Sequence, residues 1–100
     1  MPNLDVSVGH RLSQDEALRR IRAVIAQAKT QYSDEIDDLH ESWDGYAGDF
    51  KVSAQNQQVS GTVTVNPTDV TVQMTLPFIA LVFKSMIESG IRDELTRILA

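Results

Sequence analysis

The sequence predicts a single α+β domain over residues 1–100. We expect a two-layer sandwich in which two helices cover one face of an antiparallel sheet of about five strands, in the order β-α-β-β-β-β-α. Apolar residues alternate with polar ones in five short segments, which is the period of a half-buried strand. In two longer segments they recur at three- and four-residue steps, which is the period of an amphipathic helix. The length of 100 residues allows one hydrophobic core.

The first strand and the first helix are predicted near the amino terminus. Alternation over Leu4–Val8 favours a short strand. Ser13 and Glu16 fit a capping box, in which the serine hydroxyl accepts from the Glu16 amide and the Glu16 carboxylate accepts from the Ser13 amide. A helix is therefore expected from Ser13 to about Gln31. Its core stripe consists of Ala17, Leu18, Ile21, Val24, Ile25 and Ala28. The arginines opposite this stripe, Arg19, Arg20 and Arg22, are interpreted as a solvated face.

Four strands joined by short loops are predicted in the middle of the chain, and short loops join neighbouring strands into an antiparallel meander. Leu39, Glu41 and Trp43 share one face of the first of them, and Trp43 is expected to be largely buried. The predicted positions are a strand around 39–43, a glycine-containing turn over 44–49, a strand over 50–54, a loop over 55–58, a strand over 59–65, a turn over 66–69 and a strand over 70–76.

The last helix is predicted from Pro77 or Phe78 to Leu99, and it carries more apolar residues than one core face requires. At about 3.6 residues per turn, the core stripe comprises Ile79, Phe83, Met86, Ile87, Ile91, Leu95 and Ile98. Leu81 falls among polar residues, and Phe78 and Val82 flank it. Such an excess marks a contact surface for a partner or a second subunit. The alternative is that the first strand or a loop covers these side chains.

No catalytic, metal-binding or cofactor-binding constellation is expected. The chain has no cysteine, and its two histidines, His10 and His40, lie on unrelated predicted elements, whereas a zinc site needs several nitrogen or sulfur ligands together. Its glycines form no phosphate-binding loop motif. Trp43, Tyr46 and Phe50 are possible ligand-facing aromatics, with a place in the core as the alternative.

The net charge of the chain and the length of its apolar segments indicate which kinds of partner it can have. The formal net charge of -5 disfavours binding to nucleic acid, because the phosphates are also negative. The longest apolar run, Pro77–Phe83, is far shorter than the roughly 20 residues of a membrane span. The first residues lack the basic and apolar regions of a secretory signal. We therefore expect a cytoplasmic protein that spans no membrane.

Many residues over nearly the whole chain form a recognisable pattern through their order and spacing together. They are His10-Arg11-Leu12, Glu16-Ala17, Arg20, Trp43-Asp44-Gly45, Phe50, Gly61–Val65, Leu76-Pro77, Phe83-Lys84, Ile87-Glu88, Ile91 and Leu95. In these residues the chain resembles a family of small bacterial proteins, the polyhydroxyalkanoic acid system family, known from polyester-granule gene regions. The residues between Asp34 and Trp43, and the turn after Trp43, depart from this pattern.

The resemblance implies a role in polyhydroxyalkanoate storage and supplies no catalytic residues. Combined with the apolar surface, it leads us to expect a non-enzymatic interaction protein without a cofactor. Its partner would be the polyester granule surface or a granule protein, and it could form a homo-oligomer. The alternative is a domain that binds a small hydroxyacyl or lipid-like ligand, resembling a reduced helix-grip fold by analogy. An enclosed apolar cavity of several hundred cubic ångströms would favour that alternative.

Overall fold

The computed structural model describes residues 3–100 and confirms the predicted α+β fold and its element order. In chain order the elements are β1 (Asn3–Gly9), α1 (Gln14–Gln31), β2 (Asp38–Asp44), β3 (Ala47–Ala54), β4 (Gln57–Val65), β5 (Asp69–Thr75), the 3-10 helix η1 (Phe78–Phe83) and α2 (Lys84–Ile98).

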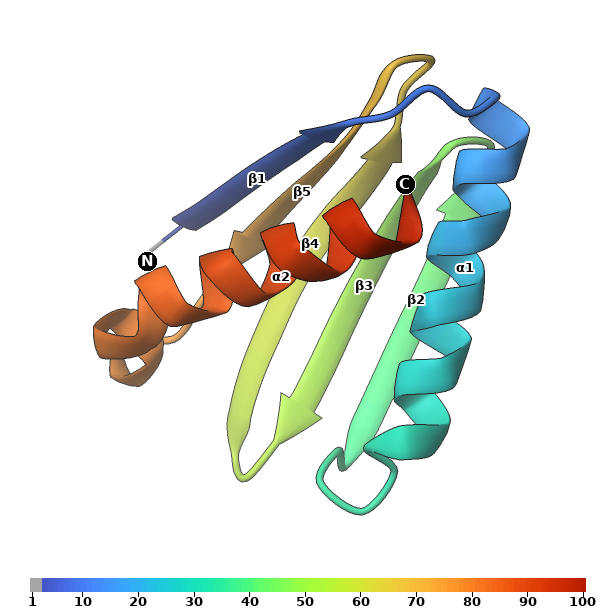
Figure 1. The fold of residues 1–100 in the computed structure, drawn as a ribbon. Coiled ribbons are helices and arrows are strands. Elements are labelled where there is room, and N and C mark those ends of the chain that lie inside the picture. Colours follow the sequence, from blue (N-terminus) through green and yellow to red (C-terminus); the bar gives the residue numbers. More distant parts are fainter. Residues whose placement is uncertain (1–2) are drawn as a thin grey trace.

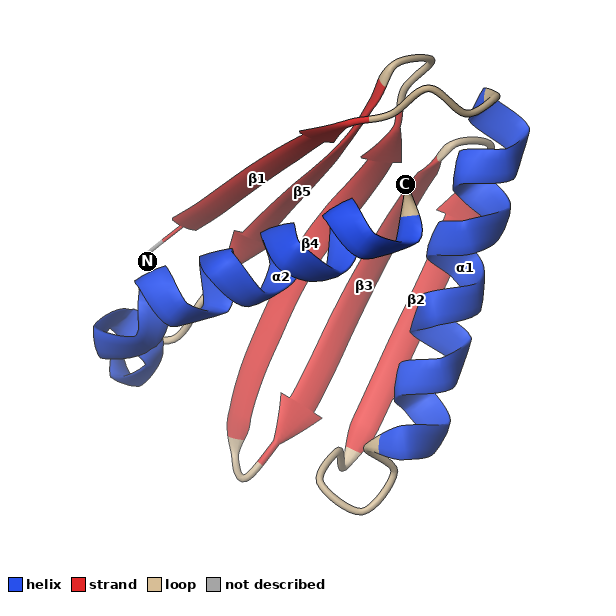
Figure 2. Ribbon diagram, viewed as in Figure 1, coloured by secondary structure: helices blue, strands red, loops and turns tan. Residues whose placement is uncertain are grey.

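The five strands form one antiparallel sheet in the order β1-β5-β4-β3-β2. Strands β2 to β5 make the expected meander, and β1 pairs with the other edge of β5. Both helices lie on the same face of the sheet, as Figures 1 and 2 show. Among the described residues the opposite face of the sheet carries no helix, so the molecule has two layers.

The strand register divides the side chains between these two faces. Val6, Val72 and Val63 are direct cross-strand partners, and all three are buried. Because side chains of cross-strand partners point to the same side, this row marks the inner face, against the helices. The neighbours of these valines in sequence are Asp, Ser, Thr and Gln, and they form the outer face.

The core lies between the inner face and the two helices, and aliphatic side chains fill it. Its buried members are Leu4, Val6, Ala17, Ile21, Val63, Val65, Val70, Val72, Leu76, Leu95 and Leu99. Helix α1 begins after its predicted cap, since the Glu16 amide donates to the Ser13 hydroxyl at 3.1 Å. The other half of the predicted capping box is wrong, because the Glu16 carboxylate binds Arg19 and Arg20 instead of the Ser13 amide.

Two hairpin turns are tighter than predicted. Gly45 and Tyr46 alone connect β2 to β3, and Gly45 has a positive φ of 61°. Gln55 and Asn56 alone connect β3 to β4, with φ values of 51° and 64°. Two consecutive residues with positive φ suit the twist of a two-residue hairpin. The strands consequently extend into the predicted loops, and Gly48 belongs to β3.

The last helix is not one continuous α-helix, and this part of the prediction is wrong. Residues 78–83 form the 3-10 helix η1, in which Ala80 N donates to Pro77 O at 3.0 Å. A 3-10 helix has three residues per turn, so a stripe computed for an α-helix does not hold there. Ile79, Phe83 and Met86, which were expected in the core, are mostly exposed. Only the later residues of that stripe, such as Ile91 and Leu95, pack on the core.

Candidate functional site

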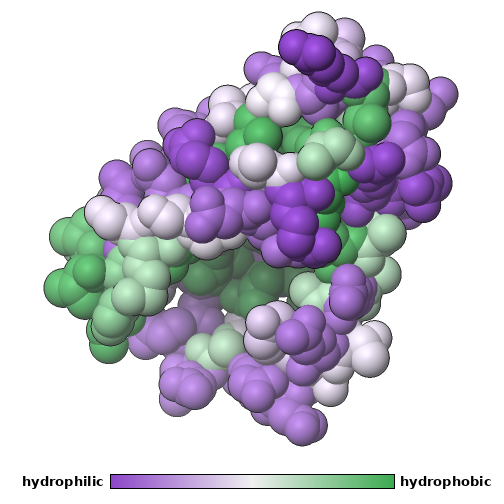
Figure 3. Space-filling model, viewed as in Figure 1, coloured by the Kyte–Doolittle hydropathy of each residue, from purple (hydrophilic) through white to green (hydrophobic). Residues whose placement is uncertain are grey.

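The start of the last helical segment carries an exposed apolar cluster, which we call the apolar tip. Its members are Phe78, Ile79, Leu81, Val82, Phe83 and Met86, and their exposed fractions run from 49% at Leu81 to 82% at Val82. Phe78, Leu81 and Val82 are the three residues predicted to form a contact surface. Their exposure agrees with that prediction, whereas the contact itself stays a prediction. Figure 3 shows hydrophobic residues gathered at this end of the molecule.

The tip segment also carries little charge, with Lys84 as the one ionisable residue between Phe78 and Met86. From Thr75 to Phe83 the chain has no ionisable side chain, and Lys84 is the first to follow. The six tip side chains expose on the order of 600 Å² of apolar surface, taking roughly 150 to 200 Å² per large side chain. Single apolar patches on monomeric proteins rarely exceed about 300–600 Å². The tip is therefore at the upper limit of what a protein leaves in contact with water.

A second apolar feature, the apolar trough, lies on the same side of the molecule. In Figure 1 the helices are close together at the carboxyl end of α2 and diverge toward η1. Figure 3 shows the surface hollowed between them, with hydrophobic residues in the hollow. The register places four half-buried side chains on this inner face of β2, β3 and β4: Leu39, Phe50, Val52 and Val59. We define the trough by these four residues.

A polar cluster links α1 to β2 beside the trough. The Glu41 carboxylate, whose side chain is only 17% exposed, accepts hydrogen bonds from Lys29 Nζ at 2.7 Å and from Trp43 Nε1 at 2.6 Å. The guanidinium of Arg22 lies over the Trp43 ring, 5.5 Å from its centroid. Burial, the largest influence, raises the pKa of Glu41, but the two hydrogen bonds and the nearby cations together lower the pKa below its usual value.

The helices are joined where they converge. The Arg20 guanidinium donates to the backbone carbonyls of Ile98 and Ala100, both at 2.9 Å, and to the Glu16 carboxylate at 2.8 Å. The prediction that Arg20 belongs to a solvated face is wrong, because its guanidinium bridges two elements. Arg22 is exposed as predicted, yet it also covers Trp43. Helical spacing alone could not reveal that Arg20 and Arg22 contact residues outside α1. The pair Glu16 and Arg20, at positions i and i+4, was the one available signal.

The three aromatics considered as possible ligand-facing residues, Trp43, Tyr46 and Phe50, do not lie together. Trp43 and Phe50 both lie on the inner face, and Trp43 is partly buried rather than largely buried, as had been expected. Each ring covers a glycine on the neighbouring strand: a Cβ added to Gly48 would meet the Trp43 ring at 2.7 Å, and one added to Gly61 would meet Phe50 Cζ at 2.7 Å. Tyr46 lies apart in the β2–β3 turn, where its hydroxyl donates to Asp15 at 2.5 Å.

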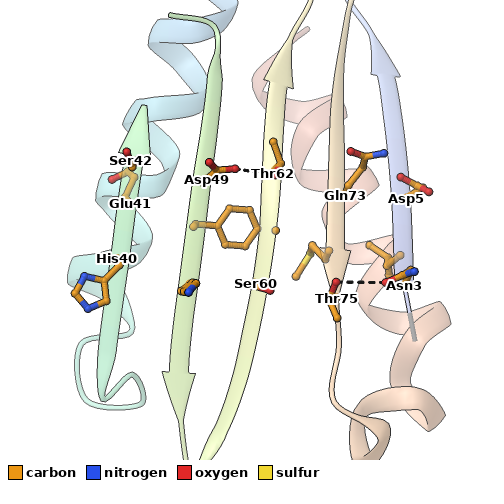
Figure 4. Close-up of a pocket in the computed structure, with 15 residues that line it drawn as sticks. Asn3, Asp5, His40, Glu41, Ser42, Asp49, Ser60, Thr62, Gln73 and Thr75 are labelled. Carbon is orange, nitrogen blue, oxygen red and sulfur yellow. Dashed lines mark hydrogen bonds between the residues drawn. The ribbon is translucent and has the colours of Figure 1, made fainter. Parts of the chain in front are cut away.

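The outer face holds an open groove of about 740 Å³ that crosses all five strands. Figure 4 shows its side chains, which stand in two rows. The rows are Asn3, Thr75, Ser60, Lys51 and His40, and Asp5, Gln73, Thr62, Asp49 and Ser42. Several of these groups bind one another, as Thr62 does with Asp49 at 2.9 Å and Thr75 with Asn3 at 3.3 Å. The groove is open, unlike the enclosed cavity expected for a hydroxyacyl ligand.

The two histidines have separate structural partners. The Leu12 amide donates to His10 Nδ1 at 3.2 Å, and His10 Nε2 lies 3.1 Å from the Asn66 carbonyl, so His10 ties the β1–α1 loop to the β4–β5 turn. His40 lies on the outer face beside Asp38. Within residues 3–100, no group of three or more His, Asp or Glu side chains could hold a metal ion. In the same range, no helix is long and apolar enough to cross a membrane.

Comparison with known families assigns the chain. The family described as "Putative polyhydroxyalkanoic acid system protein (PHA_gran_rgn)" matches residues 4–99. The chain belongs to this family. The match extends over all the described elements of the fold and confirms the resemblance found in the sequence. It links the chain to the polyhydroxyalkanoate system by its family name.

Two further comparisons add little. No curated protein matches the chain. Among solved structures, the crystal structure of the protein TTHA0849 from Thermus thermophilus is similar with a TM-score of 0.47 and 12% identity, over 98% of this chain and 94% of that chain. A likeness at this score and identity carries no inference about the present chain.

Proposed function

We propose that this protein is a non-enzymatic, cytoplasmic interaction protein that binds the polyester surface of polyhydroxyalkanoate granules through its apolar tip. The observation that carries the proposal is the cluster of six large apolar side chains, each about half exposed or more, in one segment, residues 78–86, whose single ionisable residue is Lys84. The family supports the biological setting, since its name refers to the polyhydroxyalkanoic acid system. The proposal assigns no catalytic residue and no cofactor.

The physical reason is the transfer of apolar side chains from water to an apolar phase. Burying one large aliphatic or aromatic side chain contributes roughly 1.5–3 kcal/mol. Several tip residues together therefore supply enough free energy for binding even after the cost of immobilising the protein. The small-ligand alternative is less well supported, because the outer groove is open and not an enclosed cavity.

Binding to polymer particles tests the proposal directly. Purified protein is sedimented with particles of amorphous poly(3-hydroxybutyrate), and the double variant Phe78→Ser/Val82→Ser is compared with the parent. Loss of two anchoring side chains should weaken binding at least tenfold, since about 1.4 kcal/mol corresponds to a factor of ten. The control is Tyr32→Ser, which removes a side chain that is 48% exposed at the far end of α1. It should bind like the parent.

Two outcomes would contradict the proposal. The first is equal binding by the parent and the double variant, because the tip would then not be the contact surface. The second is failure of the parent to bind polymer-only particles, because the polyester would then not be the partner. A fluorescent fusion in polyester-accumulating cells provides the matching observation in vivo: the parent should collect on granules, and the double variant should remain diffuse.

A further inference from the structure

We propose that in the absence of polyester the apolar tip of one copy occupies the apolar trough of a second copy, in a two-fold symmetric dimer that competes with granule binding. The dimer is argued from the tip and the trough alone. Only the competition rests on the proposed function. The occupant of the trough is thus a second copy of this chain.

The tip and the trough lie on one side of the molecule, next to each other. The tip projects beyond the sheet where the helices diverge, and the trough opens between the same helices (Figures 1 and 3). When a projection and a hollow adjoin on one face, a two-fold axis between them places each projection in the hollow of the other copy. Such an interface is isologous, and it closes at two subunits.

The two surfaces also match chemically. The six tip side chains are uncharged, and Lys84 is the one ionisable residue between the first and the last of them. The trough offers Leu39, Val52 and Val59, which form one cross-strand row on the inner face. Leu39 and Val52 lie outside the buried core cluster of the described chain, so they remain available for contact. Glu41 lies in the next cross-strand row, and both of its carboxylate oxygens already accept hydrogen bonds. Covering the trough therefore leaves no unpaired charge at Glu41.

The exposed apolar area of the tip and the trough is comparable to the area that a stable protein interface buries. A stable interface buries roughly 800 Å² on each partner. The tip contributes on the order of 600 Å² to it, by the estimate from its exposed side chains. The half-buried trough residues supply the remainder. A second copy of the chain can thus cover both apolar surfaces with one contact of ordinary size.

Two variants separate the dimer from granule binding. Val52→Lys places a charge in the trough and leaves the tip intact. Its matched control is Ser53→Lys, which places the same side chain one residue later, on the outer face of the same strand. Analytical ultracentrifugation should show a dimer for the parent and for Ser53→Lys. Val52→Lys and Phe78→Ser/Val82→Ser should dissociate at least tenfold more readily, with circular dichroism spectra like that of the parent.

Mixing provides a stricter test. A dimer of Phe78→Ser/Val82→Ser with Val52→Lys retains one intact contact, in which an unaltered tip meets an unaltered trough. An equimolar mixture should therefore associate more strongly than either variant alone. Val52→Lys should also bind poly(3-hydroxybutyrate) particles at least as well as the parent, because its tip is intact and no second copy competes.

The outcomes distinguish this inference from the proposed function. A parent protein that stays monomeric well above micromolar concentration overturns the dimer, whatever its binding to particles. If Val52→Lys still forms the dimer, or if the equimolar mixture of the two variants associates no more strongly than either variant alone, the tip does not bind in the trough. Particle binding that the parent and Val52→Lys both lack overturns the proposed function and leaves the dimer to stand on its own measurement.

Discussion

At the scale of single residues, two pairs of an aromatic residue and a glycine explain much of the middle of the chain. Trp43 and Gly48 are direct cross-strand partners, as are Phe50 and Gly61. In each pair the ring lies where a glycine Cβ would otherwise be. Aromatic side chains that cover glycines on a neighbouring strand protect the backbone and fix the register. The two glycines therefore make room for the aromatic rings, and the rings stabilise the pairing of the neighbouring strands.

Replacement of Gly61 tests this packing. A Cβ at Gly61 would overlap the backbone carbonyl oxygen of Gln73 and would lie 2.7 Å from Phe50 Cζ. Gly61→Ala should therefore reduce the free energy of unfolding by about 1–3 kcal/mol. Gly90→Ala is the control, because it lies in α2 with nothing within 4 Å of its added Cβ. It should increase stability by about 0.5–1 kcal/mol. Urea unfolding measures both, and an unchanged Gly61→Ala would exclude the close contact.

At the scale of elements, local chemistry made most boundaries predictable from the sequence. The Ser13 hydroxyl accepts a hydrogen bond from the amide three residues later, and α1 begins there as expected. Asn66 and Pro67 lie in the turn between β4 and β5, where a turn was expected. Residues 78–83 were mistaken for α-helix because apolar spacing does not separate three from 3.6 residues per turn over so few residues. The prediction then assigned Phe83 to the core, although it is 54% exposed.

Truncation of Phe83 tests the observed helical geometry. Because its side chain lies at the tip, Phe83→Ala should change the free energy of unfolding of the monomer by no more than about 1 kcal/mol. Leu95→Ala, in the buried part of α2, should cost roughly 2–5 kcal/mol. Chemical denaturation at several protein concentrations separates loss of folding from loss of association. A cost for Phe83→Ala as large as that for Leu95→Ala would place Phe83 in the core.

At the scale of the whole molecule, polar side chains determine how the two helices sit on the sheet. The Arg20 side chain of α1 donates to the carbonyl of Ile98 at the end of α2. The Glu41 carboxylate on β2 accepts hydrogen bonds from Lys29 of α1 and from Trp43 of its own strand. Away from the contact made by Arg20 the two helices diverge, and the trough lies between them. The sequence could not predict the trough, because a hollow depends on the angle between two helices that are more than fifty residues apart. The tip was predictable in part, since it depends on an excess of apolar residues in one segment.

Acid titration tests whether Glu41 holds α1 beside the trough. Its pKa is lowered in the folded protein from the ordinary value of 4.5, so its contribution to stability is present above that value and is lost as the pH falls through the folded pKa. Protonation removes the charge that binds Lys29 and weakens the hydrogen bond from Trp43. Because Trp43 is the only tryptophan, its emission should change with a midpoint below pH 4.5.

Two variants assign that change to one carboxylate. Glu41→Gln keeps an oxygen that can accept from Trp43 but cannot titrate, so the emission change should disappear while circular dichroism reports the same fold. Glu94→Gln is the control, since Glu94 also has a lowered pKa but pairs with Arg97 within α2. It should keep the transition. An emission change that persists in Glu41→Gln would mean that another group titrates beside Trp43, and α1 would then be attached to β2 without a titrating carboxylate at position 41.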